Sequence, residues 1–387
     1  MRSGQPAIIG AAEHAPAMRI DRGFVELHAR AGAEALADAG VGPDEVEGLL
    51  VASPMTDEGP IFLSEDVMDY LGLTNLRLEA TVNLGGASHL AMVRHAANVV
   101  AAGEADTVLC VSCGKFPAIR DVGRQLMAAV CHRDFELPYA PSVPALYGLI
   151  AQRWMYESGA TKEDLAQVPV AQDAWAKRHP TALMRDAPAV SVDDVLDGRP
   201  IAGPFSYLDC SIPCEGGGAL VVASARRARR APHRPVRVLG FGEGHTHGFL
   251  GSMADPGRTG AARSGPMALE RANRALSDID VFELYDAFSA TPLMTLEEIG
   301  VAEPGRAADL YRDGRTAPGG DLAVNTNGGL IRFGHSGTSS GFTGILEAYW
   351  QLSGRARGEQ VPGADCAFVH AYGSMLCSHV STVLEGA

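Results

Sequence analysis

Two stretches far apart in the chain, AIIGAAEH (7–14) and RVLGFGEG (237–244), carry the same pattern. Each is an apolar run that passes through a glycine and reaches a glutamate, Glu13 in the first stretch and Glu243 in the second. An alanine-rich helical pattern follows each one, ARAGAEALADAG and ALERANRALSD, and leads into a further apolar run, VEGLLVAS and VFELYDAF. The repeat therefore predicts two similar halves, each beginning with a strand, a helix and a strand.

The segments around the repeat also alternate between strands and helices. In TVNLGGASHLAMVRHAANVVAAGEADTVLCVS (81–112), a glycine-rich turn precedes a helix that Gly103 ends, and TVLCV follows as a buried strand. Strands joined by such helices form sheets covered on both faces, so we expect an α/β fold. Residues 117–215 are less regular and more helical, with Thr161 and Asp164 placed to cap a helix. We interpret them as an insertion that helps to cover an active site.

Composition limits the partners and the compartment. A net charge of −14 argues against nucleic acid as the main partner, because phosphate binding needs a basic surface. The basic cluster RRARR (226–230) could bind locally, but a solvated linker between the halves is the favoured interpretation. The start of the chain lacks a signal-peptide pattern, and no run reaches the ~20 apolar residues that cross a bilayer. We therefore expect a cytoplasmic protein with no membrane contact.

The seven cysteines are an odd number without the spacing of a disulfide framework, so we expect reduced thiols. Cys110 and Cys113 form a CxxC that could indicate metal or redox chemistry. They continue an apolar strand, and no second cysteine pair stands at metal-binding spacing, so burial is the favoured interpretation.

Several motifs resemble those of the thiolase superfamily, and the resemblance covers almost the whole chain. The most similar branch is that of the sterol-carrier-protein-x-like proteins, as PFSYLDCSIPCEGGGALVVAS, NTNGGLIRFGHSGTSSGF and VPGADCAFVHAYGSMLCSHVSTVL indicate. This resemblance implies a thiolase fold, in which two similar βαβαβαββ halves form a layered αβαβα core with a helical insertion in the first half. The halves would be residues 1–230, with the insertion at about 117–215, and residues 231–387.

The first motif is VNLGGASHL (82–90). Thiolases place a nucleophilic cysteine here, at a helix N-terminus that favours the thiolate. In this chain the position falls on Gly86, so no acyl-enzyme can form there, although the Gly86 N–H could still donate to a thioester oxygen. Ser88 is a possible substitute nucleophile. It has no apparent histidine–carboxylate pair, so a helix-capping role is favoured.

The second and third motifs supply further candidates. ELYDAFSA (283–290) stands where related thiolases carry an oxyanion-hole residue, which makes Tyr285 a candidate acid, base or oxyanion donor and Asp286 a candidate substrate-binding residue. Packing of Tyr285 in the core is the alternative. NTNGGLIRFGHSG (325–337) matches the thiolase GHP motif through Gly334 and His335, with Ser336 in place of proline. The resemblance implies that His335 polarises the thioester carbonyl.

A fourth stretch, VHAYGSMLCSH (369–379), stands where thiolases carry a second catalytic cysteine. That position falls on Ala371, followed by Tyr372 and Gly373. The resemblance makes the phenol of Tyr372 and the N–H of Gly373 candidate site groups. His370 and His379 are further candidates without an assigned role.

The chemistry left to this site is stabilisation of an oxyanion, which suits a reaction through a thioester enolate. Cleavage of a β-hydroxyacyl-CoA requires removal of the hydroxyl proton and protonation of the enolate α-carbon, and tyrosine can serve as acid or base. The chain is similar to the bacterial aldolases that shorten steroid side chains. This similarity implies a retro-aldolase in which Tyr285 and Tyr372 transfer protons and His335 donates to the oxyanion; which tyrosine is the acid stays open.

The resemblance also implies partners and cofactors. The substrate would be a coenzyme A thioester, and the chain itself would bind no metal or redox cofactor. A homodimer and a zinc-ribbon/OB-fold partner protein are expected. Two alternatives stay open: a non-catalytic subunit that binds acyl-CoA, and an acyltransferase subunit whose nucleophile comes from a partner chain. The insertion is expected to shape the pocket for the acyl group, whose identity the sequence leaves open.

Overall fold

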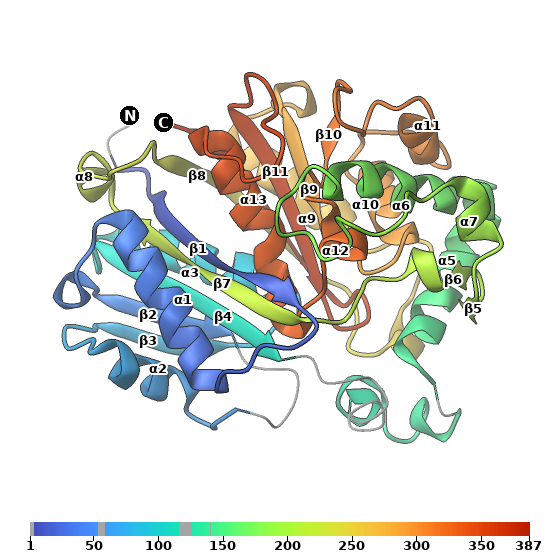
Figure 1. The fold of residues 1–387 in the computed structure, drawn as a ribbon. Coiled ribbons are helices and arrows are strands. Elements are labelled where there is room, and N and C mark those ends of the chain that lie inside the picture. The colour runs from blue at the N-terminus through green and yellow to red at the C-terminus, as the bar shows by residue number, and fades with distance from the viewer. Residues whose placement is uncertain (1–3, 53–58, 116–125, 140) are drawn as a thin grey trace.

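The computed structural model describes residues 4–52, 59–115, 126–139 and 141–387. Within these residues, ten strands form one mixed sheet in the order β10-β9-β11-β12-β8-β1-β7-β4-β2-β3 (Figure 1). The strands of the first half are β1 (Ala7–Ala17), β2 (Gly48–Ala52), β3 (Leu78–Val82), β4 (Thr107–Lys115) and β7 (Glu215–Ala223). Those of the second half are β8 (Val236–His245), β9 (Val281–Leu284), β10 (Ala323–Val324), β11 (Cys366–Gly373) and β12 (Ser378–Gly386).

The two ends of the sheet repeat one topology. From the middle outward, the order β1-β7-β4-β2-β3 corresponds to β8-β12-β11-β9-β10. In both halves the first two pairings are antiparallel and the last two are parallel. The halves join where β1 pairs with β8, through Ala7 with Arg237 and Ile8 with Val236. The repeat predicted from AIIGAAEH and RVLGFGEG is confirmed.

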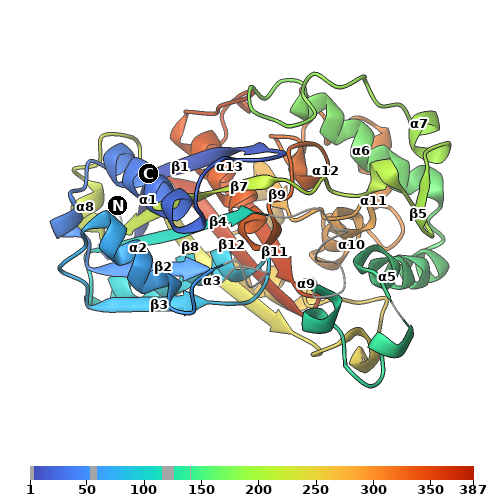
Figure 2. The same cartoon turned by 60° about the horizontal axis from the view of Figure 1, so that its bottom comes forward.

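The helices complete the predicted layers. α1 (Phe24–Ala39) and α2 (Leu63–Leu71) pack on strands of the first half, and α9 (Ala261–Ala272) packs on β8 and β12 (Figures 1 and 2). α3 (Ser88–Ala102) and α13 (Gly341–Ser353) contact each other and strands of both halves, so they lie between the halves. No helix in the described part of the chain is long and apolar enough to cross a membrane.

The repeated glycine explains why the first strand of each half lies so close to its helix. A Cβ at Gly10 would stand 2.6 Å from Cβ of Ala39 at the end of α1. A Cβ at Gly240 would stand 2.5 Å from the backbone N of Ala272 at the end of α9. Real Cβ atoms do not approach so closely, so glycine is required at the same place in both halves.

The insertion packs against the second half. Its described elements include α5 (Val143–Ser158), α6 (Lys162–Ala176), α7 (Val192–Leu196), β5 (Pro200–Ala202) and β6 (Phe205–Ser206), on the right of Figure 1; residues 117–125 and 140 lie outside the described residues. The predicted cap of α6 is confirmed, because Thr161 N donates to Asp164 Oδ2 at 2.8 Å. Asp173 in α6 pairs at 2.6 Å with buried Arg332 in α12 (Gly329–Arg332), three residues before His335. The insertion thereby supports the loop that carries His335.

Three further helices fill the connections: α8 (Ala225–Ala228), α10 (Ala290–Glu298) and α11 (Ala307–Arg312). The predicted boundary at residues 230/231 falls between α8 and β8, and the division of the chain there stays a prediction. In the basic cluster, Arg226 pairs with Asp106 and Arg227 with Glu45, so part of its charge is balanced by neighbouring carboxylates.

The CxxC pair is structural. Cys110 and Cys113 are both buried in β4 and face different clusters of the core, one on each side of the sheet. Burial raises the pKa of both thiols. All seven cysteines are free thiols, as the odd count indicated.

Candidate active site

Four segments bring the predicted residues together. Gly86 precedes α3, Tyr285 follows β9, His335 precedes the short helix η6 (Gly337–Ser340), and Tyr372 and Gly373 end β11. β9 and β11 are parallel neighbours, so their carboxyl ends meet at the same edge of the sheet. α3 and α13 then bring the other two segments to this edge from between the two halves.

The ring of Tyr285 occupies the space beside Gly86. A Cβ at Gly86 would lie 2.6 Å from Cζ and 2.7 Å from Cε2 of Tyr285, and 2.6 Å from the backbone O of Tyr372. Any side chain at position 86 would therefore meet the phenol ring. A tyrosine from the other half of the chain thus fills the space beside position 86, where the sequence motif predicts that a thiolase carries its cysteine.

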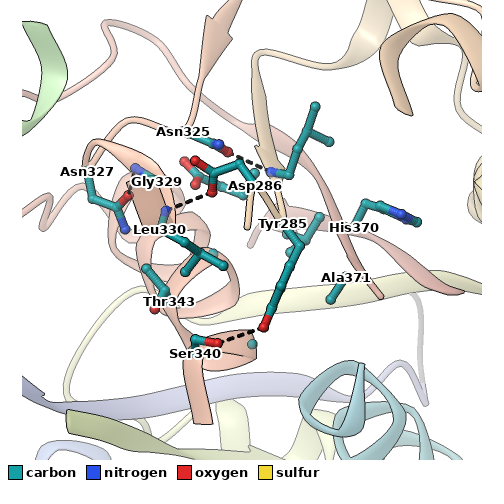
Figure 3. A pocket seen from close by; sticks show the side chains of 15 residues that line it. Tyr285, Asp286, Asn325, Asn327, Gly329, Leu330, Ser340, Thr343, His370 and Ala371 are labelled. Carbon is teal, nitrogen blue, oxygen red and sulfur yellow. Dashed lines mark hydrogen bonds between the residues drawn. The ribbon is translucent and has the colours of Figure 1, made fainter. Parts of the chain in front are cut away.

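The Tyr285 hydroxyl lies between two polar groups. It is 2.8 Å from Ser340 Oγ (Figure 3) and 2.9 Å from His335 Nε2. Burial raises the pKa of Tyr285 and lowers that of His335 to about 4. At neutral pH a protonated phenol therefore contacts a neutral imidazole, and a proton can pass between them without first crossing solvent.

Tyr372 lies in the site with its hydroxyl turned toward α10. Its ring centroid is 4.7 Å from that of Tyr285. The hydroxyl accepts from Ala287 N at 3.3 Å and donates to Thr291 Oγ1 at 3.1 Å. Burial raises the pKa of this phenol well above its ordinary value. Tyr372 is therefore a protonated group, and both contacts made by its hydroxyl in this conformation are with protein.

Glycines let the loops before α3 and after β11 touch. A Cβ at Gly373 would overlap the carbonyl of Leu84, and one at Gly85 would lie 2.9 Å from Ser374 N. Gly85 also has a φ of 56°, which side chains rarely adopt. This contact places Gly86 and Gly373 close together, as two oxyanion donors require; their role as donors stays a prediction.

The predicted cap at Ser88 is wrong in detail. Ala87 is the N-cap of α3, and Ser88 is the first residue of the helix. The Ser88 hydroxyl accepts from Leu84 N at 2.8 Å and donates to Gly85 O at 2.6 Å. It therefore closes the loop in front of the helix and binds no N–H of the helix itself. The side chain is fully buried, which does not suit a nucleophile.

His370 and His379 form a buried chain of hydrogen bonds. His379 Nε2 donates to Leu376 O at 3.0 Å, so its Nδ1 accepts from His370 Nε2 at 3.2 Å, and His370 Nδ1 accepts from Ser381 at 2.9 Å. Burial lowers the pKa of both histidines, to about 3 for His379. Leu376 has a left-handed φ of 56° in the turn that follows Tyr372. The neutral histidines anchor this turn behind the site.

The Asp286 carboxyl binds the backbone at the start of α12. Its Oδ1 accepts from Leu330 N at 2.7 Å (Figure 3), and its Oδ2 accepts from Ile331 N at 3.4 Å. Burial raises its pKa to about 8, so the carboxyl is mostly protonated at neutral pH. These contacts position the loop that leads to His335, and the substrate-binding role predicted for Asp286 stays a prediction.

A small cavity adjoins Tyr285 and Asp286. Its volume is about 20 Å³, enough for one water molecule. Asn325 lines it, and its buried Nδ2 has no hydrogen-bond partner in the described part of the chain. This cavity is too small for an acyl group, so it is not the place where the acyl chain of a substrate would bind.

Two residues were missed by the sequence analysis. Tyr147 in α5 donates to Ser374 O at 2.7 Å, and its ring lies 6.1 Å from that of Tyr372. The sequence could have indicated Tyr147, because it stands among the apolar positions of α5 that are buried. Ser340, which contacts the Tyr285 hydroxyl, lies within the quoted motif GHSGTSSG, but no pattern distinguishes it from the serine before it.

Comparison with known proteins identifies the class. Residues 242–386 match the model of the family described as "Thiolase C-terminal domain-like". The 17-hydroxy-3-oxo-4-pregnene-20-carboxyl-CoA lyase of Mycobacterium tuberculosis is 31% identical over 92% of this chain and 93% of its own length. An acetyl-CoA acetyltransferase of Methanothermobacter thermautotrophicus is 29% identical over 95% and 96%. The solved "Ltp2-ChsH2(DUF35) aldolase" is 28% identical and covers 100% of this chain and 99% of its own, with a TM-score of 0.86.

The chain belongs to the thiolase superfamily. Within it, the chain belongs to the sterol-carrier-protein-like branch, which also holds steroid side-chain-cleaving aldolases. Because relatives of similar identity carry different activities, the similarity alone does not define the reaction of this chain, and the geometry of the site has to decide it.

Proposed function

We propose that the protein is an acyl-CoA retro-aldolase. It would cleave a β-hydroxyacyl-CoA with a bulky acyl group, such as a steroid side chain, into a ketone and a shortened acyl-CoA. The observation that carries this proposal is the position of Tyr285, whose ring fills the space beside Gly86 and whose hydroxyl contacts His335. The site thus has a proton-transfer pair where a thiolase has a nucleophile. The lyase and aldolase activities named for its relatives support the same reaction class.

The proposed reaction moves one proton. The substrate hydroxyl gives its proton to Tyr285 Oη while the phenol proton passes to His335 Nε2, 2.9 Å away. The Cα–Cβ bond then breaks, which leaves a ketone and the enolate of the shortened thioester. Tyr285 then protonates the α-carbon, and the proton held by His335 restores its phenol. If Tyr372 is the acid instead, the proton held by His335 has to return to Tyr372 through Tyr285, because the Tyr372 hydroxyl contacts Ala287 N and Thr291 Oγ1. No water is consumed, and no acyl-enzyme forms.

Charge on the thioester oxygen needs donors in this scheme. The N–H groups of Gly86 and Gly373 are the proposed donors, because the contact between their loops places them together at the carboxyl end of β11. Such preorganised donors contribute on the order of 3 kcal/mol each to transition-state stabilisation. His335 would also donate to this oxygen once it is protonated.

Two kinds of assembly are proposed. The solved relative is named as a complex with a DUF35 protein, which favours the predicted zinc-ribbon/OB-fold partner for this chain as well. A homodimer would form through β3, the last strand of the sheet, whose outer edge has no paired strand among the described residues.

The test is product formation from a β-hydroxyacyl-CoA that bears a tertiary alcohol, measured by mass spectrometry with and without the partner. Tyr285→Phe should abolish cleavage while substrate binding persists. Tyr349→Phe is the control, because Tyr349 is also a buried tyrosine but lies inside α13. Binding of the thioester without cleavage by the wild-type complex would favour a carrier. A covalent acyl adduct on the partner would favour an acyltransferase subunit.

A further inference from the structure

We propose that Ser340 is a positioning residue, whose hydroxyl proton decides whether Tyr285 can give its own proton to His335. This inference rests on the proposed function. It follows from three hydrogen bonds among four atoms: Ser340 Oγ lies 2.6 Å from Gly337 O and 2.8 Å from Tyr285 Oη, and Tyr285 Oη lies 2.9 Å from His335 Nε2.

Counting protons leaves two arrangements. A serine hydroxyl has one proton, and so does a phenol. If Ser340 donates to Gly337 O, Tyr285 donates to Ser340 Oγ, and His335 Nε2 has to be the donor toward Tyr285. If Ser340 turns and donates to Tyr285 Oη, the phenol proton points at His335 Nε2, which then accepts it.

Only the second arrangement suits the removal of a proton from substrate. The phenol then gives its proton to the imidazole while its oxygen lone pair faces the substrate hydroxyl. Negative charge grows on Oη during this transfer, and the Ser340 hydroxyl donates to it at that moment. Hydrogen bonds to charged groups are worth more than those to neutral groups, so the contact is stronger in the transition state than in the ground state.

The chain contains a matched control one residue away. Ser339 belongs to the same short helix η6 and is also buried. Its hydroxyl donates to Ser336 O at 2.7 Å, three residues back, just as Ser340 donates to Gly337 O in the first of the two arrangements. The contacts of the Ser339 hydroxyl are with Ser336 and Gly216, so it differs from Ser340 in not reaching Tyr285.

The first experiment compares Ser340→Ala with Ser339→Ala in the assembled complex. Ser340→Ala should lower kcat about 10- to 100-fold with little change in KM, whereas Ser339→Ala should change kcat less than threefold. Ser340→Thr, which keeps the hydroxyl, should recover most of the lost rate. Equal losses in the two alanine variants would overturn the proposal, because they would show a general effect on η6.

The second experiment does not depend on turnover. Tyr285 is replaced by 3-fluorotyrosine, which is more acidic than tyrosine, and its ionisation is followed by ¹⁹F NMR. Ser340→Ala should raise the pKa of this phenol by about one unit, because the phenolate loses a donor, and Ser339→Ala should leave it unchanged. An unchanged pKa in Ser340→Ala refutes the role of Ser340. If the wild-type protein cleaves no substrate, the proposed function fails, but this titration still decides the question about Ser340.

Discussion

Replacing Gly86 by alanine tests whether the phenol of Tyr285 stands where a side chain at position 86 would be. The new Cβ would approach Cζ of Tyr285 and the backbone O of Tyr372, each at 2.6 Å. Overpacking of this kind costs about 1–3 kcal/mol, which for a chain of 387 residues lowers Tm by about 1–4 °C. The larger effect should be on activity, because the ring of Tyr285 has to move away from His335.

The assay is a double-mutant cycle on thermal unfolding, measured for Gly86→Ala, Tyr285→Ala and the double variant, and cleavage is measured for Gly86→Ala alone because the Tyr285 variants should be inactive. Removing the ring relieves one of the two contacts, so Gly86→Ala should cost at least 1 kcal/mol less in the Tyr285→Ala background. Gly248→Ala is the control, because a Cβ there meets nothing within 4 Å. Additive effects within about 0.5 kcal/mol, or a Gly86→Ala protein with full activity, would refute the placement of the ring.

Four other effects are expected at the site, each with its own measurement. Asp286→Asn should keep activity within a few-fold at pH 7, because a carboxyl with a pKa of about 8 is mostly neutral there, whereas Asp286→Ala should cost about 1–3 kcal/mol in a denaturant titration. The kcat–pH profile should show its acid limb near pH 4, where His335 becomes protonated, and a limb at pH 6.5 would contradict this. Stability should also fall as the pH drops from 6.5 toward 4, because the imidazole of the unfolded chain binds the proton first. Tyr147→Phe removes the hydrogen bond to Ser374 O, so it should lower the free energy of unfolding by about 1 kcal/mol and kcat by a few-fold. Tyr156→Phe is the control, because Tyr156 lies in the same helix but is exposed.

Much of the fold could be predicted because it is repeated. A strand, a glycine and a helix recur in both halves, and Gly10 and Gly240 meet the ends of α1 and α9 in the same way. The sequence also predicted two helix ends correctly, Gly103 as the C-cap of α3 and Thr161 as the N-cap of α6. The cap assigned to Ser88 was wrong because a serine that begins a helix can close the preceding loop equally well.

The residue types of the site could be predicted from its motifs, but its contacts could not. Nothing in the sequence shows that Tyr285 lies against Gly86, which is 199 positions away, because that contact depends on how α3 and β9 meet. The direction of a hydroxyl is equally hidden, and the Tyr372 hydroxyl turns toward Thr291. Tyr147 reaches the site only because the insertion folds back over the second half.

The overlap between position 86 and the ring of Tyr285 restricts how such a site can evolve from a thiolase. A chain with both a cysteine at 86 and a tyrosine at 285 would place two groups in one space. For an ancestor with a cysteine at 86, as the motif predicts, the favourable order is loss of that cysteine first and arrival of the phenol second, through an intermediate with neither group. The same order runs backward for reversion, since restoring the cysteine alone would disturb the new site without restoring the old one. The restriction acts in one direction, because the phenol of Tyr285 opposes any side chain at position 86, whereas Gly86 opposes no residue at position 285.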